Sequence, residues 1–303
     1  MKRQRLHNTN LEVSAICLGS MTFGTPVGEK DAITLTRWAI ENGVNFIDTA
    51  NIYEGYNRTI GSPGGTAETI LGKALIGQRQ RVVLASKVGM QVGPNREDGG
   101  LGREHIQREI DRSLARLRCD YLDLYYMHKP DPETPLAESI QAFDDLVQAG
   151  KIRYWGVSNY SARQLGTLLQ ACGENGWCRP VACQPAYSLL KPEVEEDLLP
   201  LCHHERIAVV PYQVLQGGLL TGKYHRGDVP PPGSRKEEKP DWVWELTGEL
   251  FDQLEGLEAQ AKVQNRTLTQ HAIQGVLVHP AVVSVVVGVK RIEQLQALIE
   301  IVA

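Results

Sequence analysis

Four side chains that can hold or transfer a proton stand at or near the ends of apolar segments: Asp48, Tyr53, Lys87 and His128. Asp48 ends the run VNFID, and Tyr53 follows it five residues later. A carboxylate in such a position is costly to bury alone, so it needs either water or a group of opposite charge. The lysine that ends the run VVLASK is the cation that we expect beside it.

These four residue types can form a proton-transfer system. A free tyrosine has a pKa of about 10, which is too high for efficient proton donation and acceptance at neutral pH. A neighbouring ammonium favours the phenolate, so we expect Lys87 to lower the pKa of Tyr53. A buried ammonium in turn needs a counter-charge, which Asp48 supplies, while His128 is expected to bind and orient a substrate oxygen.

The elements that must position these residues alternate between strands and helices along the whole chain. Short β-branched runs predict strands, and apolar residues at helical spacing predict helices, two of which have the caps Ser161 and Thr269. The strands are expected at residues 15–19, 44–48, 82–87, 121–128, 152–158, 181–184, 207–212 and 283–288. The helices are expected near residues 30–42, 66–77, 103–117, 136–149, 161–171, 193–204, 248–264, 269–279 and 291–301.

Eight strand–helix units in 303 residues predict a closed (β/α)8 TIM barrel, an α/β fold with a parallel sheet. Strands that helices cover read as nearly continuous apolar runs, as these do. We expect a single domain over residues 1–303, with an N-terminal β-hairpin. Residues 227–242 are rich in proline and charge, which predicts a long, mobile surface loop after strand seven. A doubly wound sheet is the main alternative.

The composition limits the classes of partner. With 42% of its residues in the hydrophobic set, the chain can build a large core. A net charge of -4 argues against nucleic acid or an anionic membrane as the main partner, and no run is long enough for a signal peptide or a membrane span. We therefore expect a cytoplasmic protein with reduced cysteines. The cluster Cys202-His203-His204 is interpreted as the end of a helix, and no metal site is expected.

A barrel brings the C-terminal ends of its strands together on one face, where catalytic groups collect. Taken singly, Asp48, Tyr53, Lys87 and His128 each have an ordinary structural explanation, such as a solvated loop lysine or a tyrosine that caps the core. Four titratable residues at one predicted barrel mouth favour a functional site instead.

The segments around these residues resemble the aldo-keto reductases. The resemblance runs from about residue 4 to the end of the chain, and the matching segments are GVNFIDTANIY (43–53), VVLASKVG (82–89), YLDLYYMHKPD (121–131), GKIRYWGVSNYS (150–161), PYQVLQGGLLTGKY (211–224) and HPAVVSVVVG (279–288). The resemblance implies a (β/α)8 barrel and an NADPH-dependent carbonyl reductase. By the same match Tyr53 is the general acid, Lys87 and Asp48 are its partners, and His128 orients the substrate.

The sequence contains no Gly-x-Gly-x-x-Gly motif after a strand, so a Rossmann dinucleotide site is not indicated. A barrel offers a different phosphate site, in the loops after strands seven and eight. The first of these loops, residues 212–223, contains glycines that allow close backbone approach and ends in Lys223. The second, Gly288-Val289-Lys290-Arg291, opens the last helix, whose N-terminus favours an anion.

The resemblance also implies contacts with NADPH and with the substrate. Ser158, Asn159 and Gln184 resemble residues that hold the nicotinamide carboxamide, Tyr212 resembles the aromatic residue that stacks on the ring, and Lys290 would favour the 2′-phosphate. The full set of implied cofactor contacts is Ser20, Met21, Asp48, Ser158, Asn159, Gln184, Tyr212, Gln213, Leu215, Gly217, Leu219, Lys223, Gly288, Lys290 and Gln294. The implied substrate contacts are Tyr53, His128, Phe23 and Tyr56.

Three functions are compatible with these residues. The leading one is reversible reduction of an aldehyde or ketone by NADPH, with Tyr53 as the proton donor. The second is an NADPH-binding regulatory subunit that resembles potassium-channel β subunits and has little turnover. The third is an aldolase that uses Lys87 as a Schiff-base nucleophile, which an adjacent Asp48 disfavours because it would keep the lysine protonated. The identity of the carbonyl substrate and the oligomeric state stay open.

Overall fold

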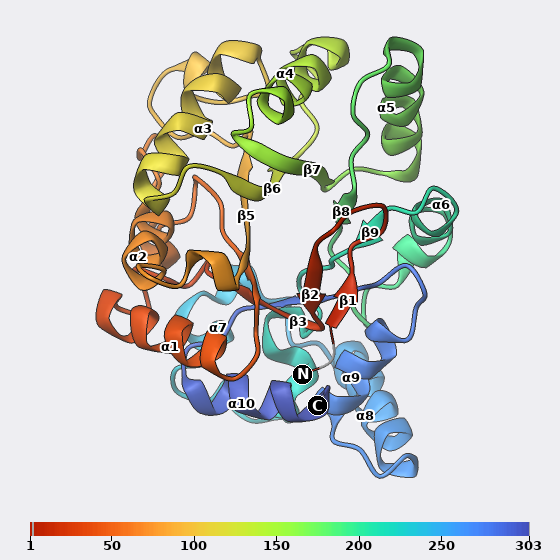
Figure 1. Cartoon of the computed structure of the whole chain (residues 1–303). Helices are drawn as coiled ribbons and strands as arrows, with labels where there is room; N and C mark the ends of the chain where they lie inside the picture. The colour runs from red at the N-terminus through yellow and green to blue at the C-terminus, as the bar shows by residue number, and fades with distance from the viewer. Residues whose placement is uncertain (2, 303) are drawn as a thin grey trace.

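The computed structural model describes residue 1 and residues 3–302. Its centre is a curved sheet of eight parallel strands in the spatial order β10-β3-β4-β5-β6-β7-β8-β9, surrounded by helices (Figure 1). The strands are β3 (Ile16–Gly19), β4 (Phe46–Asp48), β5 (Val83–Val88), β6 (Leu122–Met127), β7 (Ile152–Ser158), β8 (Ala182–Gln184), β9 (Ala208–Val209) and β10 (Val285–Val287).

The sheet closes between its two outer strands. Val209 of β9 forms a parallel bridge with Val282, which lies just before β10. The N–H of Val209 donates to the carbonyl of Ala281 over 2.8 Å, and the carbonyl of Val209 accepts from the N–H of Val283 over 3.0 Å. Each barrel strand therefore has a neighbour on both sides, and the fold is the predicted (β/α)8 barrel.

Nine helices of seven residues or more in the described part of the chain cover the barrel from outside. They are α1 (Glu29–Glu41), α2 (Thr66–Ala74), α3 (Arg103–Leu117), α4 (Leu136–Gln148), α5 (Ala162–Asn175), α6 (Leu198–His204), α8 (Gly248–Val263), α9 (Leu268–Leu277) and α10 (Ile292–Ile301). Successive side chains of a strand point to opposite faces of the sheet. Phe46 accordingly packs in the cluster inside the barrel, while Ile47 packs in the larger cluster with the helices.

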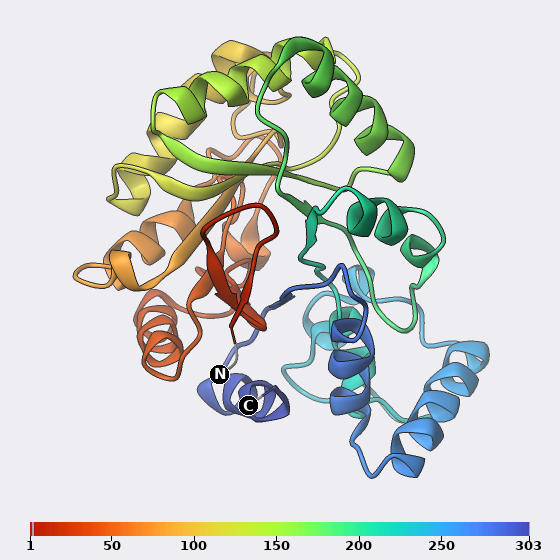
Figure 2. The same ribbon diagram turned by 45° about the vertical axis from the view of Figure 1, so that its right-hand side comes forward.

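The predicted N-terminal hairpin closes one end of the barrel. Its strands, β1 (Arg3–Arg5) and β2 (Glu12–Ser14), pair antiparallel, and Figure 2 shows the hairpin across one end of the sheet. Leu6, Leu11 and Val13 are buried against the interior residues of the barrel strands. The hairpin leads directly into β3, so it lies at the N-terminal ends of the strands, opposite the predicted catalytic face.

The helix caps agree with the prediction at one position and differ at another. The side chain of Ser161 accepts from the N–H of Gln164 and caps α5, as expected. The cap before α9 is Thr267, with Gln270 completing a capping box, so the prediction of Thr269 was wrong. A threonine at either position satisfies the capping preference, and the reciprocal bond with Gln270 favours the earlier one.

The segment after β9 also differs from the prediction. Residues 225–243, here called the strap, contain α7 (Arg235–Glu238) and the 3-10 helix η6 (Pro240–Trp242) instead of an unstructured loop. Ser234 caps α7 by accepting from the N–H of Glu237, and the N–H of Lys236 donates to the hydroxyl of Tyr224 over 3.3 Å. Local caps of this kind stabilise short elements in a sequence that is otherwise rich in proline and charge.

Candidate active site

The ends of β4 and β5 bring three of the four predicted catalytic residues together. The ammonium of Lys87 contacts the carboxylate of Asp48 and donates to the carbonyl of Thr49 over 2.8 Å. Its Nζ also lies 3.2 Å from the hydroxyl oxygen of Tyr53, within hydrogen-bond distance. Asp48 is the last residue of β4, Lys87 lies in the neighbouring strand β5, and Tyr53 lies in the loop that follows β4.

The ion pair is almost completely buried. Lys87 is 0% exposed and Asp48 is 2% exposed, and the side-chain amide of Gln184 donates to the second oxygen of Asp48 over 2.9 Å. A buried ion pair is tolerated when further hydrogen bonds satisfy its remaining atoms, which Thr49 and Gln184 do here. Burial lowers the pKa of Lys87, but the Asp48 carboxylate and Tyr53 outweigh burial and raise it above its usual value. The lysine is therefore an ammonium at neutral pH.

The pKa of Tyr53 is raised, not lowered. Burial of the phenol raises it most, Lys87 acts in the opposite direction, and the carboxylate of Asp48 raises it again. The predicted direction was therefore wrong, because the sequence pattern included the ammonium but not the desolvation of the ring. At neutral pH the side chain is a protonated phenol that points toward an ammonium.

His128 lies beside Tyr53, at the end of β6. The two rings meet edge to face with their centroids 5.9 Å apart, and the backbone N–H of His128 donates to the carbonyl of Val88. Burial, followed by the charges of Lys87 and Lys129, holds the pKa of His128 well below its usual value. The imidazole is therefore neutral, and its Nδ1 is buried with no partner among residues 1 and 3–302.

The ends of β7 and β8 add a second polar group next to this cluster. The hydroxyl of Ser158 donates to the carbonyl of Gln184, and the side-chain amide of Asn159 donates to the carbonyl of His128. Tyr212 donates to the side-chain oxygen of Asn159 over 2.7 Å. Asn159 has a φ of 63°, a left-handed conformation that asparagine tolerates better than most residues. All four predicted carboxamide and stacking residues thus lie around the catalytic cluster.

The loop after β9 has an irregular backbone. Gln213, Gln216, Gly217 and Gly218 all have positive φ, between 45° and 98°. Gln216 lies within the predicted phosphate loop, but its φ of 45° has no signature in the sequence. Of the other predicted residues here, Leu219 is buried in the core and Leu215 packs partly against it. Consecutive backbone groups in such conformations form concavities that suit a phosphate.

Three cations meet where this loop, the strap and the start of α10 approach one another. Burial lowers the pKa of Lys223, and the charges of Lys290 and Arg235 lower it further. The ammonium of Lys290 contacts the carboxylate of Glu238 and donates to the carbonyl of Gly233 over 2.8 Å. Arg235 and Glu238 were not predicted, because the charged stretch was interpreted as a solvated loop.

Two predicted substrate contacts have little exposed surface. Phe23 is 0% exposed and packs in the core between strands and helices, and Tyr56 is 5% exposed. The ring of Tyr56 faces the strap: its centroid lies 5.2 Å from that of Trp242, with the Arg235 guanidinium 5.3 Å and the Lys290 ammonium 5.5 Å from it. Tyr56 therefore contacts the cation cluster, whereas the prediction made it a substrate contact.

Several groups at this mouth fit a dinucleotide. The hydroxyl of Ser20 is buried with no partner in the described part of the chain, as is Nδ1 of His128. A Cβ added to Gly288 would meet no atom within 4 Å, so the space beside its backbone is open to a ligand. Gln294 accepts from the N–H groups of Lys290 and Arg291 and so orders the start of α10. Met21, next to Ser20, is partly exposed.

Comparisons with known proteins agree on one family. The family model "Aldo/keto reductase family" matches residues 15–303. The chain is 35% identical to the "Uncharacterized oxidoreductase YrpG" of Bacillus subtilis, and 32% identical to a "Probable voltage-gated potassium channel subunit beta" of Arabidopsis thaliana. Each match covers 98% of this chain and 89% of the relative.

A solved structure is similar over the whole chain. It is the holo form of the aldo-keto reductase AKR11C1 from Bacillus halodurans, with a TM-score of 0.81 and 29% identity, covering 100% of this chain and 91% of that one. Among the helices of residues 1 and 3–302, none combines the length and the apolar character that crossing a membrane requires.

Proposed function

The chain belongs to the aldo/keto reductase family, and from this premise we propose that it reduces an aldehyde or ketone to an alcohol with NADPH. The observation that carries the proposal is the contact of the Tyr53 hydroxyl with the buried Lys87–Asp48 pair, over 3.2 Å from Tyr53 to Lys87. This arrangement directs a phenol proton to the barrel mouth beside a fixed positive charge. We propose that residues 1–303 act as one domain.

The cofactor supplies the hydride when bound, and the residues of the chain supply the proton and the orientation. Tyr53 is the general acid, because its raised pKa keeps the phenol protonated at neutral pH. As negative charge develops on the substrate oxygen, the phenol donates its proton to that oxygen. The ammonium of Lys87 stabilises the phenolate that remains, and Asp48 keeps the lysine charged and in place.

His128 orients the carbonyl group without acting as the acid. Its lowered pKa keeps the imidazole neutral, so His128 can hydrogen-bond to the carbonyl oxygen while Tyr53 donates the proton. A neutral donor next to an ammonium also avoids a second buried positive charge. Positioning of this type contributes by holding the reacting oxygen within hydrogen-bond distance of Tyr53.

We propose that NADPH is held by the residues around the mouth. Ser158, Asn159 and Gln184 would bind the carboxamide, and Tyr212 would lie against the nicotinamide ring. Residues 213–223 would hold the pyrophosphate, and Lys290 would bind the 2′-phosphate. The open backbone at Gly288 and the cations Lys223 and Arg235 support this placement, since they offer space and positive charge in the same region.

The test is the Tyr53→Phe variant in a steady-state assay with NADPH and a panel of aldehydes and ketones. Loss of a general acid is expected to lower kcat by about 10²- to 10⁴-fold, while NADPH binding measured by fluorescence changes little. Tyr154→Phe is a matched control, because that hydroxyl contacts Asn10 at the hairpin end of the barrel. Near wild-type turnover by Tyr53→Phe would refute the proposed acid.

A second function is favoured by one comparison. The similarity to a probable potassium-channel β subunit spans nearly the whole chain, so an NADPH-binding regulator with little turnover is a distinct candidate. Tight NADPH binding together with negligible activity on the whole carbonyl panel would support this candidate over the reductase. The aldolase alternative is disfavoured, because Asp48 raises the pKa of Lys87 and a Schiff base needs a neutral amine.

A further inference from the structure

Two glutamates on the outer side of the barrel wall are buried although they lie outside the catalytic cluster. Glu68 of α2 is 0% exposed and Glu109 of α3 is 1% exposed. Burying a carboxylate is costly unless it is paired and hydrogen-bonded. Arg116 of α3 lies between them: its Nε donates to Glu68 over 2.7 Å, and its Nη2 lies 3.8 Å from Glu109.

Each glutamate also binds a neutral side chain close to a catalytic one in the sequence. Glu109 accepts from the side-chain amide of Asn51 over 3.0 Å, and Asn51 lies two residues before Tyr53. Glu68 accepts from the hydroxyl of Ser86, which directly precedes Lys87. Because neighbouring residues of a strand point to opposite faces, Ser86 faces the helices while Lys87 faces the mouth. The two glutamates and Arg116 therefore bind both the loop that carries Tyr53 and the strand that carries Lys87.

Backbone hydrogen bonds also hold the segment between Asp48 and Tyr53, since the N–H of Thr49 donates to the carbonyl of Ala85 over 2.9 Å. The backbone N–H of Asn51 donates to the carbonyl of Lys87 over 3.2 Å, so Asn51 is bound to β5 by its backbone and to α3 by its side chain. The carbonyl of Tyr53 accepts from the N–H of Ala67, in the first turn of α2. Ala67 directly precedes Glu68, so the ion pair between Glu68 and Arg116 also fixes the position of this contact.

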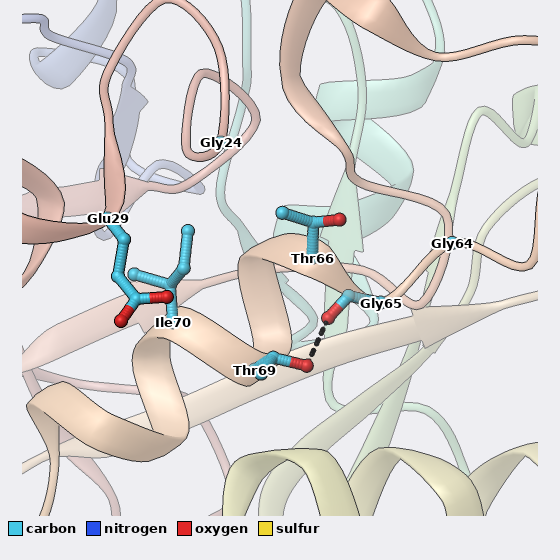
Figure 3. A pocket seen from close by; sticks show the side chains of 7 residues that line it. All are labelled: Gly24, Glu29, Gly64, Gly65, Thr66, Thr69 and Ile70. Atoms are coloured by element: carbon cyan, nitrogen blue, oxygen red, sulfur yellow. Dashed lines mark hydrogen bonds between the residues drawn. The ribbon is translucent and has the colours of Figure 1, made fainter.

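The glycines before α2 allow this close packing. Figure 3 shows Gly64 and Gly65 at the start of α2, beside a surface hollow of about 370 Å³. A Cβ on Gly64 would lie 2.1 Å from the carbonyl oxygen of Asn51, and a Cβ on Gly65 would lie 2.4 Å from Cδ of Arg116. Both residues have positive φ as well. The glycines thus bring the catalytic loop and the arginine to the same point on α2.

We propose that the Glu68–Arg116–Glu109 cluster positions Tyr53 against Lys87, and that Glu109 acts on Tyr53 through Asn51. Glu109 is a positioning residue in this proposal, since it contacts neither substrate nor cofactor. The inference rests on the proposed reductase function, because it concerns the geometry of the proposed acid. A displacement of about 1 Å in a reacting group can lower a rate by about two orders of magnitude, so the cluster acts on chemistry as well as on folding.

The experiment compares Glu109→Ala, Glu109→Gln and the control Glu104→Ala, which removes an exposed glutamate from the same helix. We expect Glu109→Ala to lower kcat by about 10- to 100-fold, with KM and the NADPH Kd within about twofold of wild type. We expect Glu109→Gln to recover part of the loss, because its amide keeps one acceptor oxygen for Asn51. Glu104→Ala should match the wild type.

The isotope effect separates positioning from damage to the fold. With NADPH deuterated at the transferred position, Glu109→Ala should show a larger isotope effect on kcat than the wild type, because the chemical step becomes limiting. A smaller fraction of folded enzyme would lower kcat without changing the isotope effect, and that result would overturn the proposal. If Glu109→Ala does not fold, Glu109→Gln and Asn51→Ala must show the same signature.

A double-mutant cycle tests the route through Asn51. If Glu109 acts through Asn51, the double variant Asn51→Ala/Glu109→Ala should lose no more activity than Asn51→Ala alone. Losses that multiply would contradict the proposal.

Wild-type protein without turnover on any carbonyl would count against the reductase function instead. In that case the pKa of Tyr53 still tests positioning, and it is measured from the absorbance difference between each protein and its Tyr53→Phe form. Glu109→Ala should raise this pKa, and an unchanged pKa would overturn the proposal.

Discussion

The phenol of Tyr53 lies 3.2 Å from a buried ammonium, yet its pKa is above its usual value. Burial is the largest cause, and the Asp48 carboxylate adds to it by cancelling part of the charge of Lys87. The ion pair therefore does not convert tyrosine into a phenolate at rest. In the proposed reaction it would stabilise the phenolate that remains after proton transfer, because the anion would face an ammonium that is already in place.

This ionisation leads to a prediction for the pH profile. The raised pKa of Tyr53 and Lys87 and the lowered pKa of His128 put all three titrations outside the neutral range. The kcat for reduction should therefore be constant between about pH 6 and pH 9, because acid, cation and neutral imidazole all keep their forms. Oxidation of the alcohol needs the phenolate, so its rate should rise about tenfold per pH unit over the same range.

Steady-state rates in both directions, measured in buffers of constant ionic strength, check this pH profile. A fall in the reduction rate below about pH 6.5 would mean that His128 titrates as an ordinary histidine and must stay neutral. An oxidation rate that is independent of pH would mean that Tyr53 is not the group that accepts the proton.

For these side chains, the sequence predicted which residues lie together but not the direction in which the pKa of Tyr53 shifts. Asp48, Tyr53 and Lys87 were recognisable because each follows or ends an apolar run, and strand ends converge in a barrel. The pKa of Tyr53 depends on how loops from distant parts of the chain exclude water, which has no local signal. The contact of Glu109 with Asn51 was equally hidden, since it joins a helix and a loop that are 58 residues apart.

Among the elements, the strap joins parts of the mouth that are far apart in the sequence. It begins after β9, yet Trp242 packs against Tyr56 in the loop after β4, and Glu238 pairs with Lys290 before α10. Lys290 is the cation proposed for the 2′-phosphate. In this structure the carboxylate of Glu238 pairs with Lys290, where the 2′-phosphate would lie in the proposed complex.

Removal of that carboxylate should strengthen NADPH binding. In Glu238→Gln, Lys290 loses its carboxylate partner and Lys223 loses a nearby negative charge, so the attraction for a phosphate increases. We expect the Kd for NADPH to fall about fivefold, which corresponds to about 1 kcal/mol, and the Kd for NADH to change less because it has no 2′-phosphate. Fluorescence titration of both nucleotides measures the two values.

Glu245→Gln is the control for this variant, since Glu245 is an exposed acid just beyond the strap. An NADPH Kd that rises in Glu238→Gln would mean that the pair with Lys290 holds the strap in a binding-competent position. An equal change for NADPH and NADH would place the 2′-phosphate away from Lys290.

The elements themselves were predictable where amphipathic periodicity was strong. Helix α3 covers 103–117, the range that its apolar spacing predicted. The strap was the main error, because α7 has only four residues and depends on the Ser234 cap and on contacts with Tyr224. Strand β9 is also shorter than the predicted 207–212, although Tyr212 still forms a parallel bridge with Ala186. Neither feature follows from hydrophobic spacing.

For the whole molecule, the alternation of strands and helices was enough to predict the (β/α)8 barrel, because parallel strands need crossover helices. The order of the eight strands follows the order in the sequence, with β10 beside β3. The closing contact at Val209 and Val282 was not predictable, because it is a single bridge between short strands. The alternative of a doubly wound sheet is excluded by this closure.

The hairpin at the N-terminal end has a consequence for the order of binding. Leu6, Leu11 and Val13 cover that end and the barrel interior is packed with side chains, so both reactants must enter from the opposite mouth. Ser158 and Gln184 are 1% and 2% exposed, whereas Tyr53 and His128 are only partly buried, so the nucleotide would sit deeper than the carbonyl. We expect the nucleotide to arrive first and depart last, and double-reciprocal plots to intersect. Parallel lines would mean that the two reactants are never bound at the same time.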